Sequence, residues 1–173
     1  MKLRSSLYLN EQERPLQLFS VLNETADHLV LKLAACIFFF DQEPLLTTSP
    51  EHPALQGQEF YPDLLKSDPA NEVTLWVECG KTTLHKLGKA SKRYRRARVV
   101  ILTALPHEGK QMAEALDKEG LSRVEVWSFQ EGEWPRWRAL VREQNDIIGE
   151  TTESSMNLVI NGQSFMTELQ RVR

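Results

Sequence analysis

The sequence has little cysteine and no long apolar run, and both absences restrict the classes of protein to which it can belong. Its longest apolar stretch, residues 33–40, is far shorter than the roughly 20 residues that span a bilayer. No apolar run follows a basic start, so we expect no secretory signal. Cys36 and Cys79 lie in apolar patterns, which predicts buried thiols rather than a disulfide, a metal site or a nucleophile. A cytoplasmic protein without a membrane partner is the simplest interpretation.

Several catalytic motifs are also missing. There is no glycine-rich phosphate loop, since Gly80 and Gly88 are isolated, and there is no Gly-x-Ser-x-Gly nucleophile elbow. The four histidines are scattered, which argues against a zinc site. These absences argue against P-loop nucleotide hydrolases, serine hydrolases and zinc enzymes.

The composition is that of an ordinary globular domain. Of the 173 residues, 41% are hydrophobic and 26% are charged, which is sufficient for one core. The net charge is −3 and the isoelectric point is about 5.9, so the molecule as a whole does not attract polyanions. We predict a single domain over residues 1–173.

Hydrophobic periodicity predicts a mixed α/β sheet that is flanked by helices and extended by β-hairpins at both ends. Strands are expected at residues 60–65, 73–79, 98–104 and 124–129, and helices at residues 23–39, 82–96, 108–119 and 134–144. The hairpins are expected at residues 3–22 and 155–169, as accessories to a core of about residues 23–130. Residues 149–155 then form a polar link.

Residues 41–58 contain three prolines and predict a long loop with one short strand at residues 45–48. Loops of this length in small domains are often functional. This segment is therefore a candidate surface for a protein partner.

Two carboxylates mark the centre of the sequence. Asp63 follows Pro62, and Glu78 lies near the end of the strand predicted at residues 73–79, on the face opposite an aliphatic set. Carboxylates at neighbouring strand ends can share one Mg²⁺ or Mn²⁺, because hard cations prefer carboxylate oxygens. Strands disfavour Glu, so Glu78 points to function, whereas Asp63 after a proline is also typical of a turn. Lys81, close behind, could stabilise charge or orient water.

Positive charge gathers directly after this pair. Between Cys79 and His107 there is no acidic residue, yet 8 of the 21 lysines and arginines fall there. On helical spacing these residues form an exposed ridge, the footprint of phosphate-backbone binding. The alternative is a solvated helix face whose acids come from elsewhere in the fold. The ridge residues expected to bind nucleic acid are Lys86, Lys89, Lys92, Arg93 and Arg96.

The central stretch resembles a known family. Pro62-Asp63 followed by Glu78-Cys79-Gly80 looks like the restriction-endonuclease-like signature, in which Pro-Asp precedes Asp/Glu-x-Lys. Residues 75–80 (Leu-Trp-Val-Glu-Cys-Gly), with Glu24 at the start of an apolar helix, resemble more closely the bacterial YaeQ family, a variant branch of that superfamily. The similarity spans about residues 24–105.

This resemblance implies a restriction-endonuclease-like core with catalytic Asp63 and Glu78 on adjacent strands, a magnesium ion between them, and Glu24 as a further helical carboxylate. It leaves the motif lysine open, because Gly80 stands at that position. Either the strand ends there and lets Lys81 turn back, or Lys86 or Lys89 reaches the same space from the following helix. His28, one turn after Glu24, is expected to be a partner of a carboxylate rather than a ligand.

Three functional hypotheses follow. The first is a metal-dependent phosphodiesterase acting on DNA or RNA. The second is a catalytically inactive protein of the same fold that binds nucleic acid or a protein partner, since the motif lysine is missing. The third is an interaction module that uses residues 41–58 and the terminal hairpins, in which case the basic ridge should be salt-bridged or covered.

Overall fold

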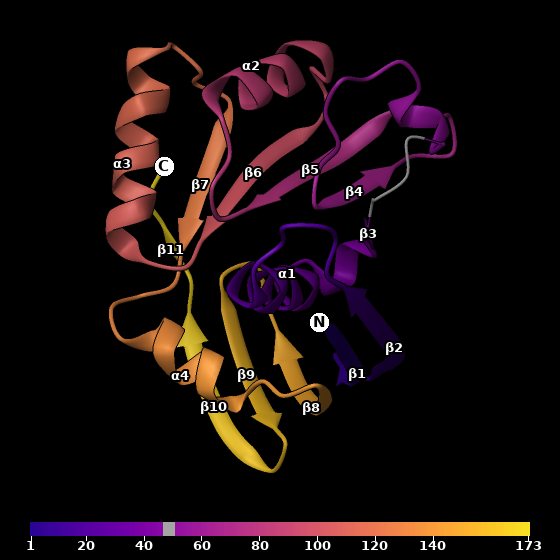
Figure 1. The fold of residues 1–173 in the computed structure, drawn as a ribbon, viewed down its shortest axis with the longest axis vertical. Coiled ribbons are helices and arrows are strands. Elements are labelled where there is room, and N and C mark those ends of the chain that lie inside the picture. The colour runs from indigo at the N-terminus through magenta and orange to yellow at the C-terminus, as the bar shows by residue number, and fades with distance from the viewer. Residues whose placement is uncertain (47–50) are drawn as a thin grey trace.

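The computed structural model describes residues 1–46 and 51–173 as a mixed α/β fold with two sheets (Figure 1). The first sheet has the strand order β11-β7-β6-β5-β4-β3. Its centre, β5-β6-β7, is parallel, and β4 and β11 run antiparallel to their neighbours. The strands are β3 Leu45–Leu46, β4 Leu64–Ser67, β5 Val73–Cys79, β6 Arg98–Thr103, β7 Val124–Ser128 and β11 Gln170–Arg171.

The second sheet has the order β10-β9-β8-β1-β2 and unites the two ends of the chain. Its strands are β1 Lys2–Leu9, β2 Gln12–Phe19, β8 Gln144–Thr151, β9 Ser155–Ile160 and β10 Gln163–Glu168. The hairpins β1-β2 and β9-β10 confirm the two expected from the sequence. They are not additions to one mixed sheet, because β8 joins both of them into a sheet of their own.

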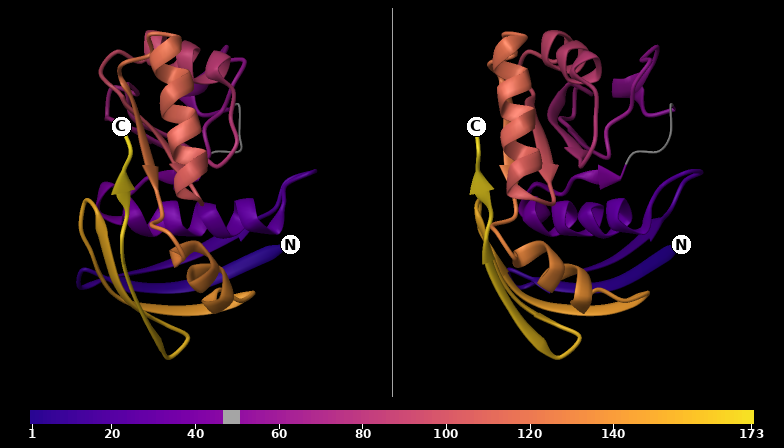
Figure 2. Two further views of the ribbon diagram at one scale, coloured as in Figure 1. Left: turned by 90° about the vertical axis from the view of Figure 1, so that its left-hand side faces the viewer. Right: turned by 60° about the vertical axis from the view of Figure 1, so that its left-hand side comes forward.

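Helix α1 (Ala26–Phe38) lies between the two sheets, as both views of Figure 2 show. Every residue from Leu29 to Phe38 is buried, since apolar side chains surround this part of the helix on all sides. One continuous core includes α1, the inner face of the second sheet and the facing side chains of β5 and β6. The lysine in this run, Lys32, is the exception that defines the site described below.

A second core lies on the opposite face of the first sheet, under α2 (Leu84–Arg93) and α3 (Pro106–Lys118). Trp76 of β5 and Leu87 of α2 belong to it. Helix α4 (Glu133–Leu140) packs instead near β10, where Trp137 is fully buried. Strand β5 therefore separates two cores, and its alternate side chains enter different ones.

Three sequence predictions need correction. The helix predicted from residue 23 begins at Ala26 with Thr25 as its cap, because Asn23 adopts a left-handed turn with φ +67° while the Thr25 hydroxyl accepts from the His28 amide. The helix predicted at residues 134–144 ends at Leu140, and the first three residues of the expected polar link, 149–151, belong to strand β8. In β8 only alternate side chains such as Ile147 are buried, which hid the strand in a polar sequence.

The strands before β5 are shorter than expected. The strand predicted at residues 60–65 begins only at Leu64, because Pro62 precedes the ladder. Of the strand predicted at residues 45–48, β3 covers Leu45 and Leu46, and Thr47 and Thr48 lie outside the described residues. Within the part of the chain that is described, no helix has the length and apolar character to cross a membrane.

Candidate metal and phosphate site

Asp63 is held where β4 meets β5. Its amide donates to the Val77 carbonyl over 3.0 Å, and its Oδ2 accepts from the Cys79 amide over 2.8 Å. Burial alone opposes its charge, but hydrogen bonding to His28, the positive charges of His28 and Lys32 and the Cys79 amide together lower the pKa of Asp63. Asp63 is therefore an ionised carboxylate near the boundary between the strand ends and α1.

One side of α1 supplies the partners of Asp63. Glu24, His28 and Lys32 are spaced by four residues and so lie along one side of the helix and its entry. His28 Nδ1 lies 3.0 Å from Glu24 Oε1, and His28 Nε2 lies 3.2 Å from Asp63 Oδ2. The hydrogen bond to Asp63 raises the pKa of His28 above its usual value despite partial burial. His28 therefore bridges two carboxylates, as a partner residue should.

Lys32 completes this cluster as a buried ammonium. Its Nζ lies 3.1 Å from Glu24 Oε1 and 3.6 Å from Asp63 Oδ1, and its side chain is 6% exposed. Desolvation lowers the pKa of Lys32, but the negative charges of Asp63 and Glu24 outweigh it and raise the pKa. Sequence reasoning missed this residue. The available signal was a single charge in the otherwise apolar run 29–40.

The sequence predicted that Glu24, Asp63 and Glu78 would hold a metal ion, but these are not the groups that the fold gathers most closely. Within the described residues, the group whose ligand atoms all lie within 4.8 Å of one another is Glu24, His28 and Asp63. Glu78 is not part of it. Glu24 is also engaged on both oxygens, because its Oε2 accepts from the Val21 amide over 2.9 Å.

Glu78 lies on the other face of β5, within the second core's side of the sheet. Its Oε1 accepts from the Trp76 indole over 2.8 Å, and its Oε2 lies 2.8 Å from Lys86 Nζ. Burial, with a smaller contribution from the negative charge of Asp63, raises the pKa of Glu78 to about 7 against the opposing effect of Lys86. The two carboxylates are thus electrostatically coupled although their hydrogen-bond partners differ.

The lysine that contacts Glu78 comes from α2. Thr83 caps this helix through the Lys86 amide, which places Lys86 in the first turn, above the end of β5. Gly80 has φ +71°, so the chain turns away directly after β5. Lys81 is exposed and lines a pocket on the Glu24 and His28 side instead. Of the three lysines considered from the sequence, the structure brings Lys86 to Glu78.

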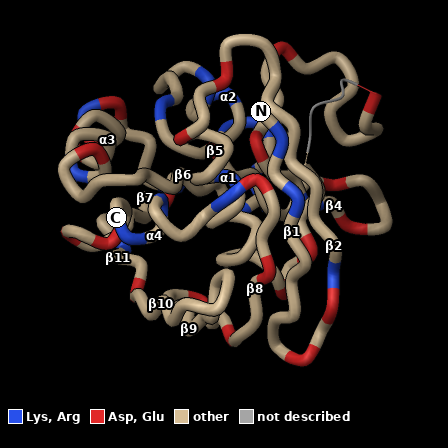
Figure 3. The backbone as a smooth tube through the Cα atoms, turned by 60° about the horizontal axis from the view of Figure 1, so that its bottom comes forward, with Lys and Arg blue, Asp and Glu red and all other residues tan. Residues whose placement is uncertain are grey.

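The basic ridge runs along α2, where Figure 3 shows lysine and arginine positions in blue. Part of it has acidic partners: Lys89 lies 2.8 Å from Glu59 Oε2, and Arg96 lies 3.4 Å from Glu72 Oε2. Within the described residues, no carboxylate lies within ion-pair distance of Lys92 or Arg93. The ridge is thus partly neutralised by acids from the preceding loops and partly available to an anion.

Comparison with known proteins agrees with this fold. The sequence profile described as "YaeQ protein" matches residues 22–169, most of the chain. The chain belongs to the YaeQ family. The match extends well beyond the residues that carried the resemblance, which ended near Leu105, and it includes α3, α4 and β8 to β10.

Two crystal structures of YaeQ proteins share the fold. The protein from Xanthomonas axonopodis pv. citri aligns over 99% of this chain and 97% of its own, with a TM-score of 0.72 at 17% identity. The protein from Pseudomonas syringae aligns over 99% and 95%, with a TM-score of 0.76 at 13% identity. No curated protein matches the sequence. At these identities, the likeness establishes the YaeQ architecture alone.

Proposed function

We propose that this YaeQ protein is a metal-dependent phosphodiesterase of the restriction-endonuclease-like superfamily, acting on DNA or RNA. The observation that supports the proposal is the 2.8 Å contact between Lys86 Nζ and Glu78 Oε2. It supplies, from α2, the ammonium that the strand lacks at Gly80. A carboxylate pair at adjacent strand ends, a nearby lysine and a basic helix are the groups that this chemistry needs.

The donor set fits a hard divalent cation. Asp63 and Glu78 offer oxygen atoms, which suit Mg²⁺ or Mn²⁺. Glu78 is 3% exposed and faces one partly exposed lysine, while the charge of Asp63 acts against its ionisation. A cation held by these carboxylates would therefore be favourable. Such an ion, when bound, activates water and stabilises negative charge on phosphate.

The protein's own residues have separable roles in this scheme. Lys86 holds the Glu78 carboxylate and stabilises charge that develops on the phosphate. Glu24 does not need to bind the ion directly, since it fixes His28 and Lys32, which in turn orient Asp63. The remaining cations of α2, such as Arg93, attract the phosphate backbone of the substrate.

The test is calorimetric titration with Mg²⁺ and Mn²⁺, followed by cleavage assays on single- and double-stranded DNA and RNA. We expect binding and cleavage by the wild type and loss of both in Glu78→Gln, which keeps the shape of the side chain. Glu72→Gln is the matched control, because Glu72 is exposed and its ion pair, among the residues that the structure describes, is with Arg96. Absence of binding by the wild type at millimolar metal contradicts the proposal, as does cleavage that survives Glu78→Gln.

One observation favours a second candidate, a metal-free member of this fold that binds nucleic acid without cutting it. With His28 protonated, Glu24 and Asp63 face two positive charges, so this half of the site is already neutral. If Lys32 stands in place of a cation, the wild type binds no metal and Lys32→Met gains metal affinity. Metal binding by the wild type that Lys32→Met leaves unchanged refutes this candidate.

A further inference from the structure

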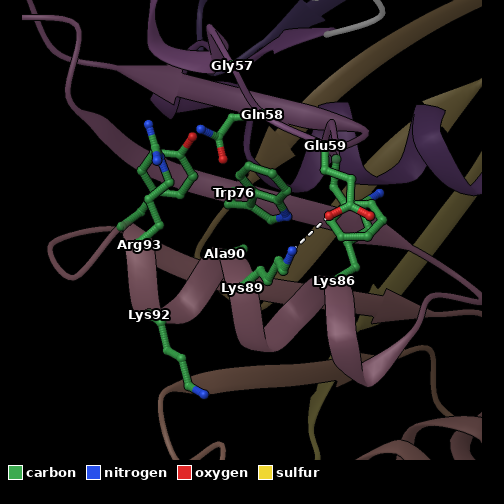
Figure 4. Close-up of a pocket in the computed structure, with 11 residues that line it drawn as sticks. Gly57, Gln58, Glu59, Trp76, Lys86, Lys89, Ala90, Lys92 and Arg93 are labelled. Atoms are coloured by element: carbon green, nitrogen blue, oxygen red, sulfur yellow. Dashed lines mark hydrogen bonds and ion pairs between the residues drawn. The ribbon is translucent and has the colours of Figure 1, made fainter.

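A cavity of about 590 Å³ lies between α2 and the segment that precedes Pro62 (Figure 4). It is separate from the Glu24 and His28 side of the site. Trp76 forms its floor, and Lys86 lines it, so both hydrogen-bond donors to Glu78 border this cavity. Its volume is within the roughly 300–1,000 Å³ typical of small-ligand sites.

The walls combine aromatic faces with cations. Phe60 and Tyr94 are half-buried and line the cavity, and the Tyr94 ring centroid lies 5.5 Å from that of Trp76. Lys89 Nζ lies 5.9 Å from the Phe60 centroid, and the Arg93 guanidinium lies 5.8 Å from the Tyr94 centroid. A ligand that fits this lining has a flat ring and a negative charge a short distance from it.

We propose that this cavity binds one nucleotide of single-stranded nucleic acid, with its base against Phe60 and Tyr94 and its phosphate on Lys89 and Arg93. Base stacking on aromatic side chains beside a cationic groove is how single strands are bound without sequence preference. A duplex keeps its bases stacked inside the helix and cannot present one here. The inference rests on the proposed function, because it names the substrate of that same site: a single strand, or the frayed end of a duplex.

Glu59 competes with the phosphate. Its carboxylate lies 2.8 Å from Lys89 Nζ, with both side chains more than half exposed, and Figure 4 draws this ion pair at the cavity. With its amide oriented to suit Arg93, the Gln58 oxygen accepts from Arg93 Nη2 and Nε over 2.8 Å. The segment 57–60 is thus fastened to α2 through the two cations that the nucleotide phosphate needs. Binding exchanges these partners for phosphate oxygens.

The cations that line the cavity differ in where they point. Lys92 belongs to the lining, but its side chain points away from Trp76 in Figure 4, whereas Lys89 points toward Glu59 and the cavity. Backbone attraction by the ridge as a whole requires Lys92 and Lys89 to contribute equally. A nucleotide in the cavity requires Lys89 and Arg93 to contribute far more than Lys92.

The experiment is calorimetric titration of the full chain with AMP, UMP, inorganic phosphate and a short single-stranded oligonucleotide, with EDTA present. EDTA removes any metal, so binding is measured apart from cleavage. We expect Arg93→Ala and Lys89→Ala to weaken AMP binding at least tenfold, and Lys92→Ala to weaken it less than twofold. Lys110→Ala on α3, exposed and remote from the cavity, is the matched charge control.

Two further variants separate base from phosphate and test the competing acid. Phe60→Leu keeps apolar bulk but removes the aromatic face, so we expect at least fivefold weaker AMP binding and unchanged phosphate binding. Glu59→Gln frees Lys89, so we expect AMP to bind several-fold more tightly.

Equal losses in Lys92→Ala and Lys89→Ala overturn the inference, as does a Phe60→Leu variant that binds AMP like the wild type. If the variants weaken oligonucleotide binding as expected but adding Mg²⁺ or Mn²⁺ produces no cleavage, the nucleotide cavity is upheld and the phosphodiesterase is refuted. If the metal produces cleavage but the variants do not have the expected effects on binding, the phosphodiesterase is upheld and the nucleotide cavity is refuted.

Discussion

Asp63 and Glu78 occupy the ends of adjacent strands and are both largely buried, yet their protonation equilibria are shifted in opposite directions. The pKa of Asp63 is lowered, and the pKa of Glu78 is raised to about 7. Asp63 is matched by His28, Lys32 and a backbone amide, whereas Glu78 has one lysine and one indole. Burial raises the pKa of both carboxylates, and the additional donors and positive charge around Asp63 outweigh it there, whereas they do not at Glu78.

Lys32 and Lys86, the lysines that contact these two carboxylates, differ in their exposure to solvent. Lys32 comes from the helix between the sheets and is 6% exposed, while Lys86 comes from the outer helix α2 and is 20% exposed. Lys32 is surrounded by two carboxylates and an imidazole, and of these Glu24 is 2% exposed, Asp63 15% and His28 31%. The Asp63 side is therefore a charge-matched ionic cluster, whereas Glu78, 3% exposed, has one lysine, which lines the cavity beside α2.

The largest effect should come from breaking the charge-matched cluster around Lys32. Lys32→Met leaves Glu24 and Asp63 together without their shared ammonium, so we expect a loss of about 3–5 kcal/mol in the free energy of unfolding. Lys86→Met should lose less, about 1–2 kcal/mol, because Glu78 can take up a proton instead. Urea denaturation at pH 7 measures both. Equal losses would mean that the two sides do not differ as described.

The pH dependence of stability sharpens the comparison next. The folded pKa of Glu78 is raised from 4.5 to about 7, so the contribution of this group is fully present below about pH 4.5 and is lost as pH rises through 7. The total change is about 3 kcal/mol at roughly 1.4 kcal/mol per pKa unit. In EDTA, Glu78→Gln should remove this slope between pH 4.5 and 7.

Asp63→Asn is the contrasting variant. The folded pKa of Asp63 lies below 3.8, so its stabilisation is present above that pH and is lost as pH falls through the depressed pKa. Removing it should therefore cost stability at neutral pH and flatten the acid limb. If Asp63→Asn and Glu78→Gln each alter the same part of the curve of stability against pH, the two pKa values are not shifted in opposite directions.

A divalent cation should act on the Glu78 side. At a concentration one hundred times its dissociation constant, Mg²⁺ or Mn²⁺ should stabilise the wild type by about 2.7 kcal/mol. Glu78→Gln should show no such gain, and Glu72→Gln should retain it. Thermal unfolding with and without metal measures the effect, and equal stabilisation of Glu78→Gln would place the ion elsewhere.

The smallest effect concerns Gly80, which separates the two sides. Its φ of +71° is unfavourable for other residues, although an added Cβ would meet only Leu31 at an ordinary 3.6 Å. Gly80→Ala should therefore lose about 1 kcal/mol from backbone strain alone. Gly88, in the helix α2 and also with 3.6 Å of space, should gain about 0.5–1 kcal/mol on replacement by Ala. A loss in both variants would point to packing rather than φ.

The sequence predicted the strand β5, the three helices α1 to α3 and both hairpins because each has a local period or turn signal. It could not predict that the hairpins unite, since the pairing of β1 with β8 joins residues about 140 positions apart. The polar start of β8 concealed the strand that makes this connection, because only one of its faces is buried.

The site was predictable to a similar degree. Motif spacing singled out Asp63 and Glu78, but it left the lysine open among Lys81, Lys86 and Lys89. The role of Lys32 depends on three-dimensional packing, because only the fold brings α1 beside Asp63. The separation of Glu78 from the Glu24 and His28 group follows from the two faces of β5, because α1 packs against one face and α2 against the other.

The pairing of β1 with β8 also has a consequence for synthesis on the ribosome. Residues 4–9 bond to residues 144–149, so the sheet that covers one side of α1 cannot close until nearly the whole chain has been made. Until then one side of α1, the most apolar helix, stays exposed. Contacts between residues so far apart in the sequence also form slowly. The nascent chain should therefore depend on chaperones and aggregate readily when truncated before β8.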